Sequence, residues 1–186
     1  GAAGARVALN YCNDMAAGER ALAEFRAAGH CGSLFRADVT DGGAVAKLVE
    51  RVTAELGPVG ILVLNATPGQ PQRPIEQCEW AAYQTMFDYF VKSPYLLTRA
   101  VLAGMKQKRF GRIVNIGSDV FRRGSPNFSA YVAAKGAQAG WTRSMANELA
   151  PWQITVNIVS PGWIPVARHD KDPKAMKDAY RARIPL

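Results

Sequence analysis

Short apolar runs alternate along the chain with longer amphipathic stretches, and this alternation constrains the fold more than any other feature. The apolar runs cover residues 5–11, 32–39, 59–66, 111–118 and 154–162. Between them, the sequence predicts helices over residues 15–29, 40–57, 79–108 and 129–148. Strands that alternate with helices form parallel sheets with right-handed crossovers. We therefore expect an α/β fold: a doubly wound, Rossmann-like parallel sheet in three α/β/α layers, within a single domain over residues 1–186.

Several residues predict where these elements end and which faces they bury. The run 59–66 (VGILVLNA) is nearly all apolar, which is typical of a parallel strand buried on both faces. Gly29 is a stop signal for the first helix, and Thr40 or Asp41 is the expected cap of the second. Pro94 must break or kink the long helical stretch. The second helix has an apolar face formed by Val45, Leu48, Val49, Val52 and Leu56.

Composition restricts the function classes. No apolar run approaches the ~18 residues that a membrane helix needs, so we expect no membrane partner. Cys12, Cys31 and Cys78 lack metal-ligand spacing, which indicates no metal site and ordinary thiols in a reducing cytoplasm. The net charge of +8 favours an anionic partner, such as a nucleotide cofactor or a nucleic acid, or is simply solvated, and charge alone does not choose among these. The basic cluster at 106–112 lacks a DNA-binding motif, so we expect no nucleic acid.

Polar residues at the ends of the predicted strands are the first candidates for a site, because parallel sheets bind ligands there. Ser118 follows the fourth strand. Tyr131 lies thirteen residues later, at the start of the next helix, and Lys135 is one turn further on the same face. A loop of that length can return Tyr131 to the side of Ser118.

These three side chains suit proton transfer to a carbonyl oxygen. A phenol has an ordinary pKa of about 10, which is poorly matched to neutral pH. A nearby ammonium favours the phenolate and lowers that pKa. A serine hydroxyl can hold the oxygen while negative charge develops on it. Because tyrosine and lysine at this spacing also occur on many helices by chance, the position of Ser118 carries much of the argument.

Ser118 and the Tyr131-x-x-x-Lys135 motif resemble the active site of the short-chain dehydrogenases/reductases. Further segments match the same family in register from about Arg6 to Pro165: ADVTD (37–41), LVLNATPG (62–69) and VNIVSPGW (156–163). The resemblance implies NAD(P)-dependent oxidation of an alcohol or reduction of a carbonyl. Ser118 would position the substrate, Tyr131 would act as acid and base, and Lys135 would bind the nicotinamide ribose and tune the tyrosine.

The resemblance also implies a cofactor site. Asp38 and Val39 would contact the adenine, while Asn65 and Ala66 would lie beside the cofactor. Other expected cofactor-binding residues are Tyr11, Tyr131, Lys135, Pro161, Gly162 and Ile164. The position near Tyr11, where NAD-preferring members carry an acid, has none here, so NADP(H) is favoured over NAD(H). Phe121, Phe128 and Trp163 would form an apolar wall of the substrate cleft.

The sequence also departs from the family pattern. The segment GAAGARVALNY corresponds to the end of the family's first helix, and neither the Gly-rich turn nor the family's last strand is present in 1–186. We expect an incomplete piece of a longer protein, because a sheet without those strands would expose apolar edges. Phe90 stands where an asparagine usually holds a water of the proton relay. Leu64, Thr67 and Val166 replace other usual residues.

The resemblance also bears on the assembly of the protein and on whether it is an active enzyme. The family pairs its long helices between subunits, which implies a homodimer or homotetramer acting on a small carbonyl or alcohol substrate. The loss of the asparagine at Phe90 leaves an alternative open: a catalytically weakened or silent member that binds a dinucleotide or a protein. The retention of Ser118, Tyr131 and Lys135 together favours the enzyme.

Overall fold

All five expected strands are present in the computed structural model, which describes residues 1–164 and 173–182. The strands are β1 (Val7–Tyr11), β2 (Gly32–Arg36), β3 (Ile61–Leu64), β4 (Gly111–Ile116) and β5 (Ile154–Val159). All described strand pairs are parallel, with Val7 opposite Gly32, Ile61 opposite Arg112 and Gly111 opposite Ile154. The predicted parallel α/β fold is confirmed.

The strands form two sheets and not the one continuous sheet that we expected. β1 pairs with β2, and β3, β4 and β5 pair in that order. The facing edges of β1 and β3 line a cavity of about 720 Å³, and within the described residues no strand lies between them. Because neither β1 nor β3 has a strand to pair with on this side among the described residues, the hydrogen bonds of the sheet are interrupted between them.

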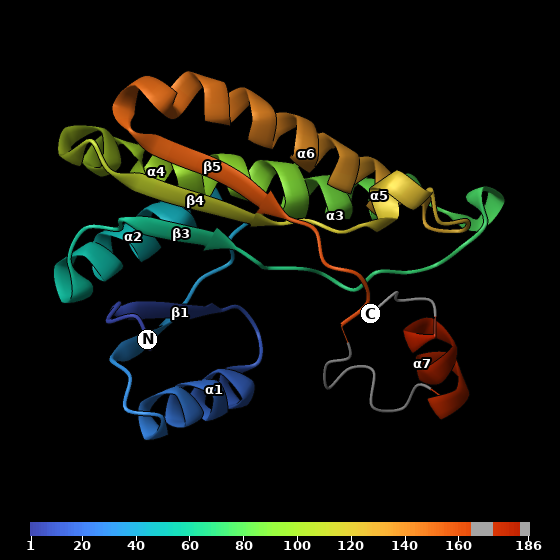
Figure 1. Ribbon diagram of the computed structural model, residues 1–186, viewed down its shortest axis with the longest axis horizontal. Coiled ribbons are helices and arrows are strands. Elements are labelled where there is room, and N and C mark those ends of the chain that lie inside the picture. The colour runs from blue at the N-terminus through green and yellow to red at the C-terminus, as the bar shows by residue number, and fades with distance from the viewer. Residues whose placement is uncertain (165–172, 183–186) are drawn as a thin grey trace.

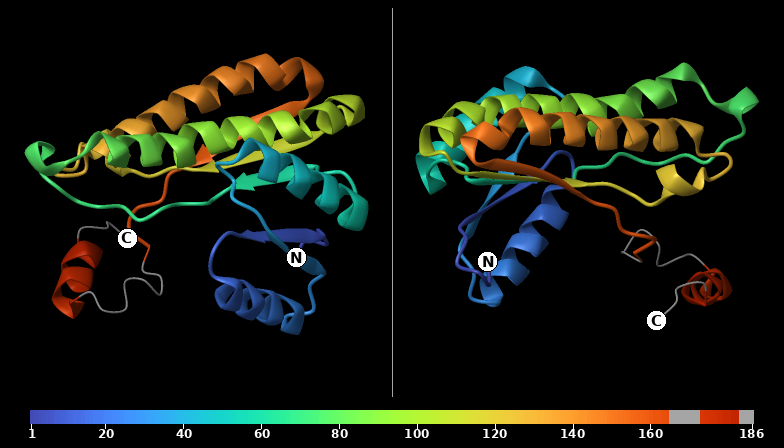
Figure 2. Two further views of the ribbon diagram at one scale, coloured as in Figure 1. Left: turned by 180° about the vertical axis from the view of Figure 1, so that it is seen from behind. Right: turned by 45° about the horizontal axis from the view of Figure 1, so that its top comes forward.

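Helices cover the sheets unequally. The remaining elements are α1 (Met15–Ala27), α2 (Gly42–Leu56), η1 (Ile75–Gln77), α3 (Trp80–Phe87), η2 (Asp88–Lys92), α4 (Ser93–Lys108), α5 (Val120–Arg123), α6 (Ser129–Leu149), η3 (Ala150–Trp152) and α7 (Lys174–Arg181). The pair β1–β2 lies between α1 and α2, whereas α4 and α6 run side by side over one face of β3–β5 (Figures 1 and 2).

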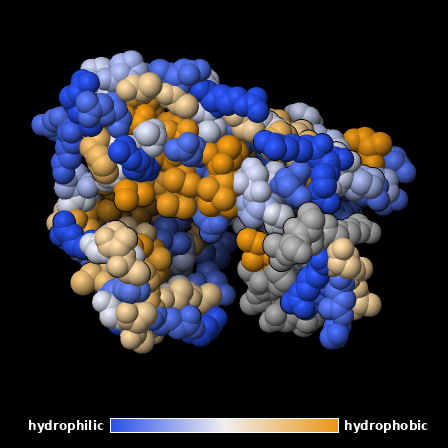
Figure 3. Space-filling model, in the orientation of Figure 1, coloured by the Kyte–Doolittle hydropathy of each residue, from blue (hydrophilic) through white to orange (hydrophobic). Residues whose placement is uncertain are grey.

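The opposite face of β3–β5 is open among the described residues. Ile61, Val63 and Val159 are 55%, 56% and 54% exposed on that face. Figure 3 shows hydrophobic side chains gathered over these strands. The expectation that the run 59–66 is buried on both faces is therefore wrong for the described structure, because only the face beneath α4 is covered by a helix.

Local sequence signals explain the helix ends. Asp41 caps α2, its carboxylate accepting from the Ala44 N–H at 2.6 Å, which settles the choice between Thr40 and Asp41. Asp14 caps α1 in the same way, and Gly29 follows that helix with a φ of 81°. The predicted face of α2 is buried at Val45, Leu48 and Val52, with Val49 and Leu56 partly buried beside them.

Pro94 has the predicted effect on the long helical stretch. It lies at the start of α4 and has no N–H to donate to the carbonyl four residues earlier. The preceding turn, η2, is a π-helix over Asp88–Lys92. Such a widened turn often marks a functional site. In this protein the turn η2 places the ring of Phe90, which is 2% exposed, against the face of α6 that carries Tyr131.

Candidate active site

Ser118 lies just beyond the end of β4, where the chain leaves the sheet. Its side chain is mostly buried, and its Oγ accepts from the Val120 N–H at 3.4 Å. The next residue, Asp119, donates its N–H to the Pro161 carbonyl at 3.2 Å. The segments after β4 and after β5 are therefore joined beside Ser118.

Tyr131 and Lys135 share the buried face of α6, as their spacing predicted. Tyr131 is 9% exposed and Lys135 is 3% exposed. The Tyr131 ring stacks on Phe128 at 4.7 Å between centroids and meets the edge of Phe90 at 5.4 Å. The Lys135 Nζ lies 5.6 Å from the centroid of the Tyr131 ring. An ammonium at this distance can influence the ionisation of the phenol.

Two sets of contacts bring Ser118 to the same place as the helix pair. The Lys135 Nζ donates to the Ile116 carbonyl at 2.6 Å, two residues before Ser118. Val120, two residues after it, packs against the apolar cluster that contains Tyr131. The three candidate catalytic residues thus gather where β4 leaves the sheet. This arrangement could polarise a carbonyl and supply a proton to its oxygen.

Burial changes the acid–base behaviour of Lys135. Removal from water lowers the pKa of its ammonium from 10.5 to about 7, because the charged form loses its hydration. Hydrogen bonds to Ile116 O and to Gln138 Oε1, at 2.6 and 3.1 Å, favour the charged form. The burial effect is larger than that of the two bonds, since the pKa still falls.

Phe90 is part of this site and does more than fill space. The Lys135 Nζ lies 3.7 Å from the centroid of its ring, within cation–π distance. The sequence indicated that Phe90 cannot hold a relay water, but it did not indicate that the ring contacts the lysine.

Sequence analysis also missed a buried polar network behind the lysine. Gln138, Asn115 and Thr142 are 1%, 0% and 4% exposed. They hydrogen-bond to one another, and Gln138 bonds to Lys135. A signal was available, because Gln138 follows Lys135 by three residues and so shares its helix face.

Several predicted cofactor residues line one cavity of about 430 Å³. Tyr11 is the last residue of β1, Asp38 and Val39 follow β2, and Ala66 follows β3. Asn65 instead lines the larger cavity between β1 and β3, together with Val39 and Ala66. The carboxyl ends of three strands therefore meet where a nucleoside was expected.

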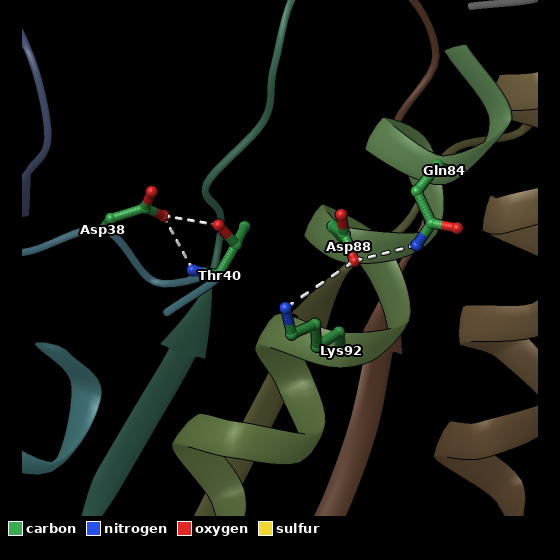
Figure 4. A network of polar contacts seen from close by, with 5 residues as sticks. All are labelled: Asp38, Thr40, Gln84, Asp88 and Lys92. Carbon is green, nitrogen blue, oxygen red and sulfur yellow. Dashed lines mark hydrogen bonds and ion pairs between the residues drawn. The ribbon is translucent and has the colours of Figure 1, made fainter. Parts of the chain in front are cut away.

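Asp38 is held in place as an anion beside this cavity. Its carboxylate accepts from the Thr40 hydroxyl at 2.7 Å and from the Thr40 N–H at 2.8 Å (Figure 4). These bonds, with a smaller effect from the charge of Lys92, lower the pKa of Asp38 below its ordinary value. Burial, together with the charge of Asp38, raises the pKa of Tyr89 on the same cavity. An ionised acceptor suits a ligand group that donates, such as an exocyclic amine.

Figure 4 also shows the polar contacts of Asp88 on the π-helical turn η2. The Lys92 Nζ lies 4.0 Å from the Asp88 carboxylate, which also accepts from the Gln84 amide at 3.2 Å. These contacts span the π-helical turn η2 and its junctions with α3 and α4. Both contacts lie on the exposed side of the turn that carries Tyr89 and Phe90.

The remaining predicted cofactor residues follow β5. Pro161 contacts the segment after Ser118, as described above. Gly162 approaches the Tyr180 hydroxyl so closely that a Cβ there would overlap it. The Tyr180 hydroxyl also accepts from the Trp163 N–H at 2.6 Å, so α7 is attached to this segment. Ile164 is 59% exposed, and Val166 lies outside the described residues.

Similarity to known proteins agrees with the fold and the family resemblance. A sequence profile of the family described as short chain dehydrogenase matches residues 1–177. The chain is 39% identical over 132 residues to the 3-oxoacyl-(acyl-carrier-protein) reductase FabG of Haemophilus influenzae, covering 68% of this chain and 52% of that protein. It is 34% identical over 182 residues to the cis-4-hydroxycyclohexanecarboxylate dehydrogenase of Sinomonas cyclohexanicum, covering 97% and 73%.

Solved structures give the same result. A blue fluorescent protein from a metagenomic library, in complex with NADPH, superposes with a TM-score of 0.83 at 30% identity, covering 96% of this chain and 73% of that one. An NAD+-bound xylitol dehydrogenase superposes with a TM-score of 0.82 at 30% identity, covering 88% and 62%. Within the described residues, none of the helices has the length and apolar character needed to cross a membrane. The family profile spans most of the chain and the relatives and solved structures agree with it, so the chain belongs to the short-chain dehydrogenase family.

Proposed function

We propose that this chain carries the catalytic site of an NADPH-dependent oxidoreductase that interconverts a carbonyl and an alcohol. The observation that carries the proposal is the meeting of Ser118, Tyr131 and Lys135 where β4 leaves the sheet. Ser118 positions the substrate oxygen, Tyr131 donates its hydroxyl proton to that oxygen, and Lys135 favours the phenolate that remains. The bound nicotinamide supplies the hydride to the carbonyl carbon.

The cavity residues support a nucleotide cofactor. Tyr11, Asp38, Val39 and Ala66 would hold the adenosine end. The end of β1 carries no acidic residue. The Arg36 Nε donates to the carbonyl of Cys12, the residue directly after β1, at 3.2 Å, so a guanidinium lies beside the end of this strand. A guanidinium there favours a 2′-phosphate. We therefore expect a lower KM for NADPH than for NADH.

The named relatives and the charge suggest the substrate class. The named substrates are a 3-oxoacyl group and a 4-hydroxycyclohexanecarboxylate, so each combines a ketone or secondary alcohol with an acyl or carboxyl group in the same molecule. The net charge of +8 favours anionic molecules. Assays should start with small ketones that bear a carboxylate or a thioester.

Tyr131→Phe tests the proposal. The variant keeps the ring that contacts Phe90 and Phe128 but loses the ionisable hydroxyl, so NADPH consumption should fall by about 10³-fold or more while the fold is retained. Tyr95→Phe is the matched control, because Tyr95 is exposed on α4 and its hydroxyl accepts from the Arg99 guanidinium at 2.7 Å. Equal activity of Tyr131→Phe and the unmodified protein would remove Tyr131 from the mechanism.

A silent dinucleotide-binding member is the second candidate, and Phe90 favours it. Its ring covers one side of the Lys135 ammonium, where the family pattern has a polar side chain. This candidate expects NADPH to bind, with no turnover of any carbonyl. A substrate-dependent loss of NADPH that requires Tyr131 would exclude it.

Assembly and location follow as further proposals. The long helices α4 and α6 lie side by side on the outside of the sheet, which suits pairing with a second copy as a homodimer or homotetramer. Light scattering of the purified protein measures this directly. Its three cysteines are free thiols, in keeping with a cytoplasmic protein.

A further inference from the structure

The buried side of Lys135 is enclosed by the protein's own groups. Its Nζ donates to Ile116 O and to Gln138 Oε1, and the face of Phe90 lies 3.7 Å away. An ammonium has three hydrogens to donate. Two oxygens and one aromatic face therefore account for its surroundings on this side. Of the two oxygens that accept from Lys135, the one of Ile116 belongs to the backbone and the one of Gln138 belongs to a side chain. Only the Gln138 acceptor can therefore be removed by a substitution.

Gln138 is itself fixed by a chain of buried hydrogen bonds. Its Nε2 donates to Asn115 Oδ1 at 3.3 Å, and Asn115 Nδ2 donates to Thr142 Oγ1 at 3.1 Å. The Thr142 hydroxyl donates to the Gln138 carbonyl at 2.7 Å, which closes the chain on α6. A buried side chain whose polar groups are all paired has little freedom to turn.

The direction of this chain of bonds is set by the lysine. An ammonium only donates, so the oxygen of the Gln138 amide must face it. The amide nitrogen then faces the oxygen of Asn115, and the nitrogen of Asn115 faces Thr142. Each amide has one orientation that satisfies its neighbours. The network is therefore built to present an acceptor to Lys135.

We propose that Gln138 is a positioning residue, which holds the Lys135 ammonium in place for its action on Tyr131 while Phe90 closes the other side. The role rests on the proposed function. Gln138 lies seven residues, about two helical turns, after Tyr131 and bonds to the Lys135 ammonium, so it acts through the lysine. Where the family pattern has an asparagine that holds a water of the proton relay, this chain has Phe90, and the lysine here bonds to a glutamine from the protein interior.

The competing interpretation is that Gln138 only fills space in the core. The two interpretations differ in how its removal responds to pH. An acceptor bonded to Lys135 stabilises the charged ammonium more than the neutral amine. Tyr131 is the titratable group whose ring lies 5.6 Å from the Lys135 Nζ. Tyr83, Tyr89 and Cys78 belong to the apolar cluster that contains Tyr131 and Phe90, and the described ion pairs do not include Lys135.

The first experiment is a double-mutant cycle of urea unfolding on the full chain. It compares the unmodified protein with Gln138→Met, Lys135→Met and the double variant, at about pH 6 and about pH 9.5. We expect Gln138→Met to lower the urea midpoint more at the lower pH, where Lys135 is charged, and this difference to vanish when Lys135 is Met. An equal loss at both pH values, with or without Lys135, would overturn the inference.

The second experiment is kinetic and uses Thr98→Val as a matched control. Thr98 is equally buried, at 4% exposure, and lies on α4 outside the network. For Gln138→Met we expect kcat to fall by about 10- to 100-fold with little change in KM. The pH midpoint for alcohol oxidation should rise by about half a unit or more, since Tyr131 loses part of its cationic neighbour. Thr98→Val should not move that midpoint.

The two experiments separate failure of the inference from failure of the proposed function. An active protein in which Gln138→Met keeps the original kcat and pH midpoint would overturn the role of Gln138. A protein without oxidoreductase activity in any form would contradict the proposed function. In that case the pH-dependent coupling between Lys135 and Gln138 still decides whether the glutamine holds the lysine.

Discussion

At the scale of single residues, the candidate site is defined by the burial of Lys135. A lysine that is 3% exposed loses hydration, and two acceptors with one aromatic face only partly replace it. The protein retains this unfavourable group at the centre of the site. Such strongly perturbed groups cluster at functional sites, where their proton affinity serves the chemistry.

This burial predicts how stability depends on pH. The folded pKa of Lys135, about 7, lies below the ordinary value of 10.5, so between these values the unfolded chain binds a proton that the folded chain does not. The free energy of unfolding should therefore rise as the pH increases from about 7 to about 10.5, by up to about 5 kcal/mol. Below this window the full penalty of burying the charge is present.

Lys135→Met is the comparison that isolates this effect. The variant keeps a long apolar side chain and has no proton to lose, so its unfolding free energy should lack the rise. Urea unfolding at several pH values measures the difference between the two proteins, which cancels the contribution of the tyrosines. Parallel curves for Lys135→Met and the unmodified protein would contradict the prediction.

At the scale of elements, close packing of α4 and β5 on β4 requires a glycine. A Cβ at Gly111 would lie 2.6 Å from Met105 Sδ and 2.9 Å from Ile154 Cγ2, and Met105 and Ile154 are both fully buried. Neither neighbour can move freely in a packed core. The first residue of β4 therefore sets how closely the helix and the neighbouring strand approach.

Gly111→Ala and Gly104→Ala should have opposite effects on stability. Gly111→Ala overpacks the core and should lower the free energy of unfolding by about 1–3 kcal/mol. Gly104 lies inside α4 with nothing within 4 Å of an added Cβ, so Gly104→Ala should raise it by about 0.5–1 kcal/mol through helix propensity. Thermal or urea unfolding of both variants provides the check. Stabilisation by Gly111→Ala would show that Met105 has room to move.

The helix elements also show how one local feature shapes the site. Pro94 removes a hydrogen bond, and the π-helical turn before it brings Phe90 to Tyr131 and Lys135. The sequence showed that Pro94 must disturb the helix. It did not show that the disturbance would present an aromatic ring to the lysine, because that depends on the register of η2 against α6.

At the scale of the whole molecule, the two sheets are related by strand order. The described order is β2-β1 and then β3-β4-β5. In a doubly wound sheet of order 3-2-1-4-5-6, β2 and β1 correspond to strands 3 and 2, and β3, β4 and β5 correspond to strands 4, 5 and 6, so the position of strand 1 is the one left between the two sheets. The cavity of about 720 Å³ lies at that position, with backbone of β1 and β3 on its two sides.

Amide hydrogen exchange should detect this interruption. β4 is paired on both edges, so its amides should exchange slowly. Those amides of β1 and β3 that point into the cavity have no partner strand among the described residues, and should exchange faster by orders of magnitude. Equal protection along β1, β3 and β4 would mean that another strand occupies the cavity in the protein studied.

The sequence by itself determined the elements and the candidate catalytic residues. Alternating apolar and amphipathic segments specify five parallel strands, and helical spacing places Tyr131 and Lys135 on one face. These are local properties, set by periodicity, caps and turn residues. The family motifs added the expected roles of Ser118 and of the residues around Asp38.

Only the tertiary structure decided which groups surround Lys135 and how the strands are divided between sheets. Phe90, Asn115 and Gln138 come from three separate elements, and their contacts with the lysine or with each other depend on how η2 and β4 pack against α6. The exposure of Ile61 and Val63 depends on what covers the open face of β3. Such long-range packing leaves no periodic signal in the sequence, because each residue alone is compatible with several neighbours.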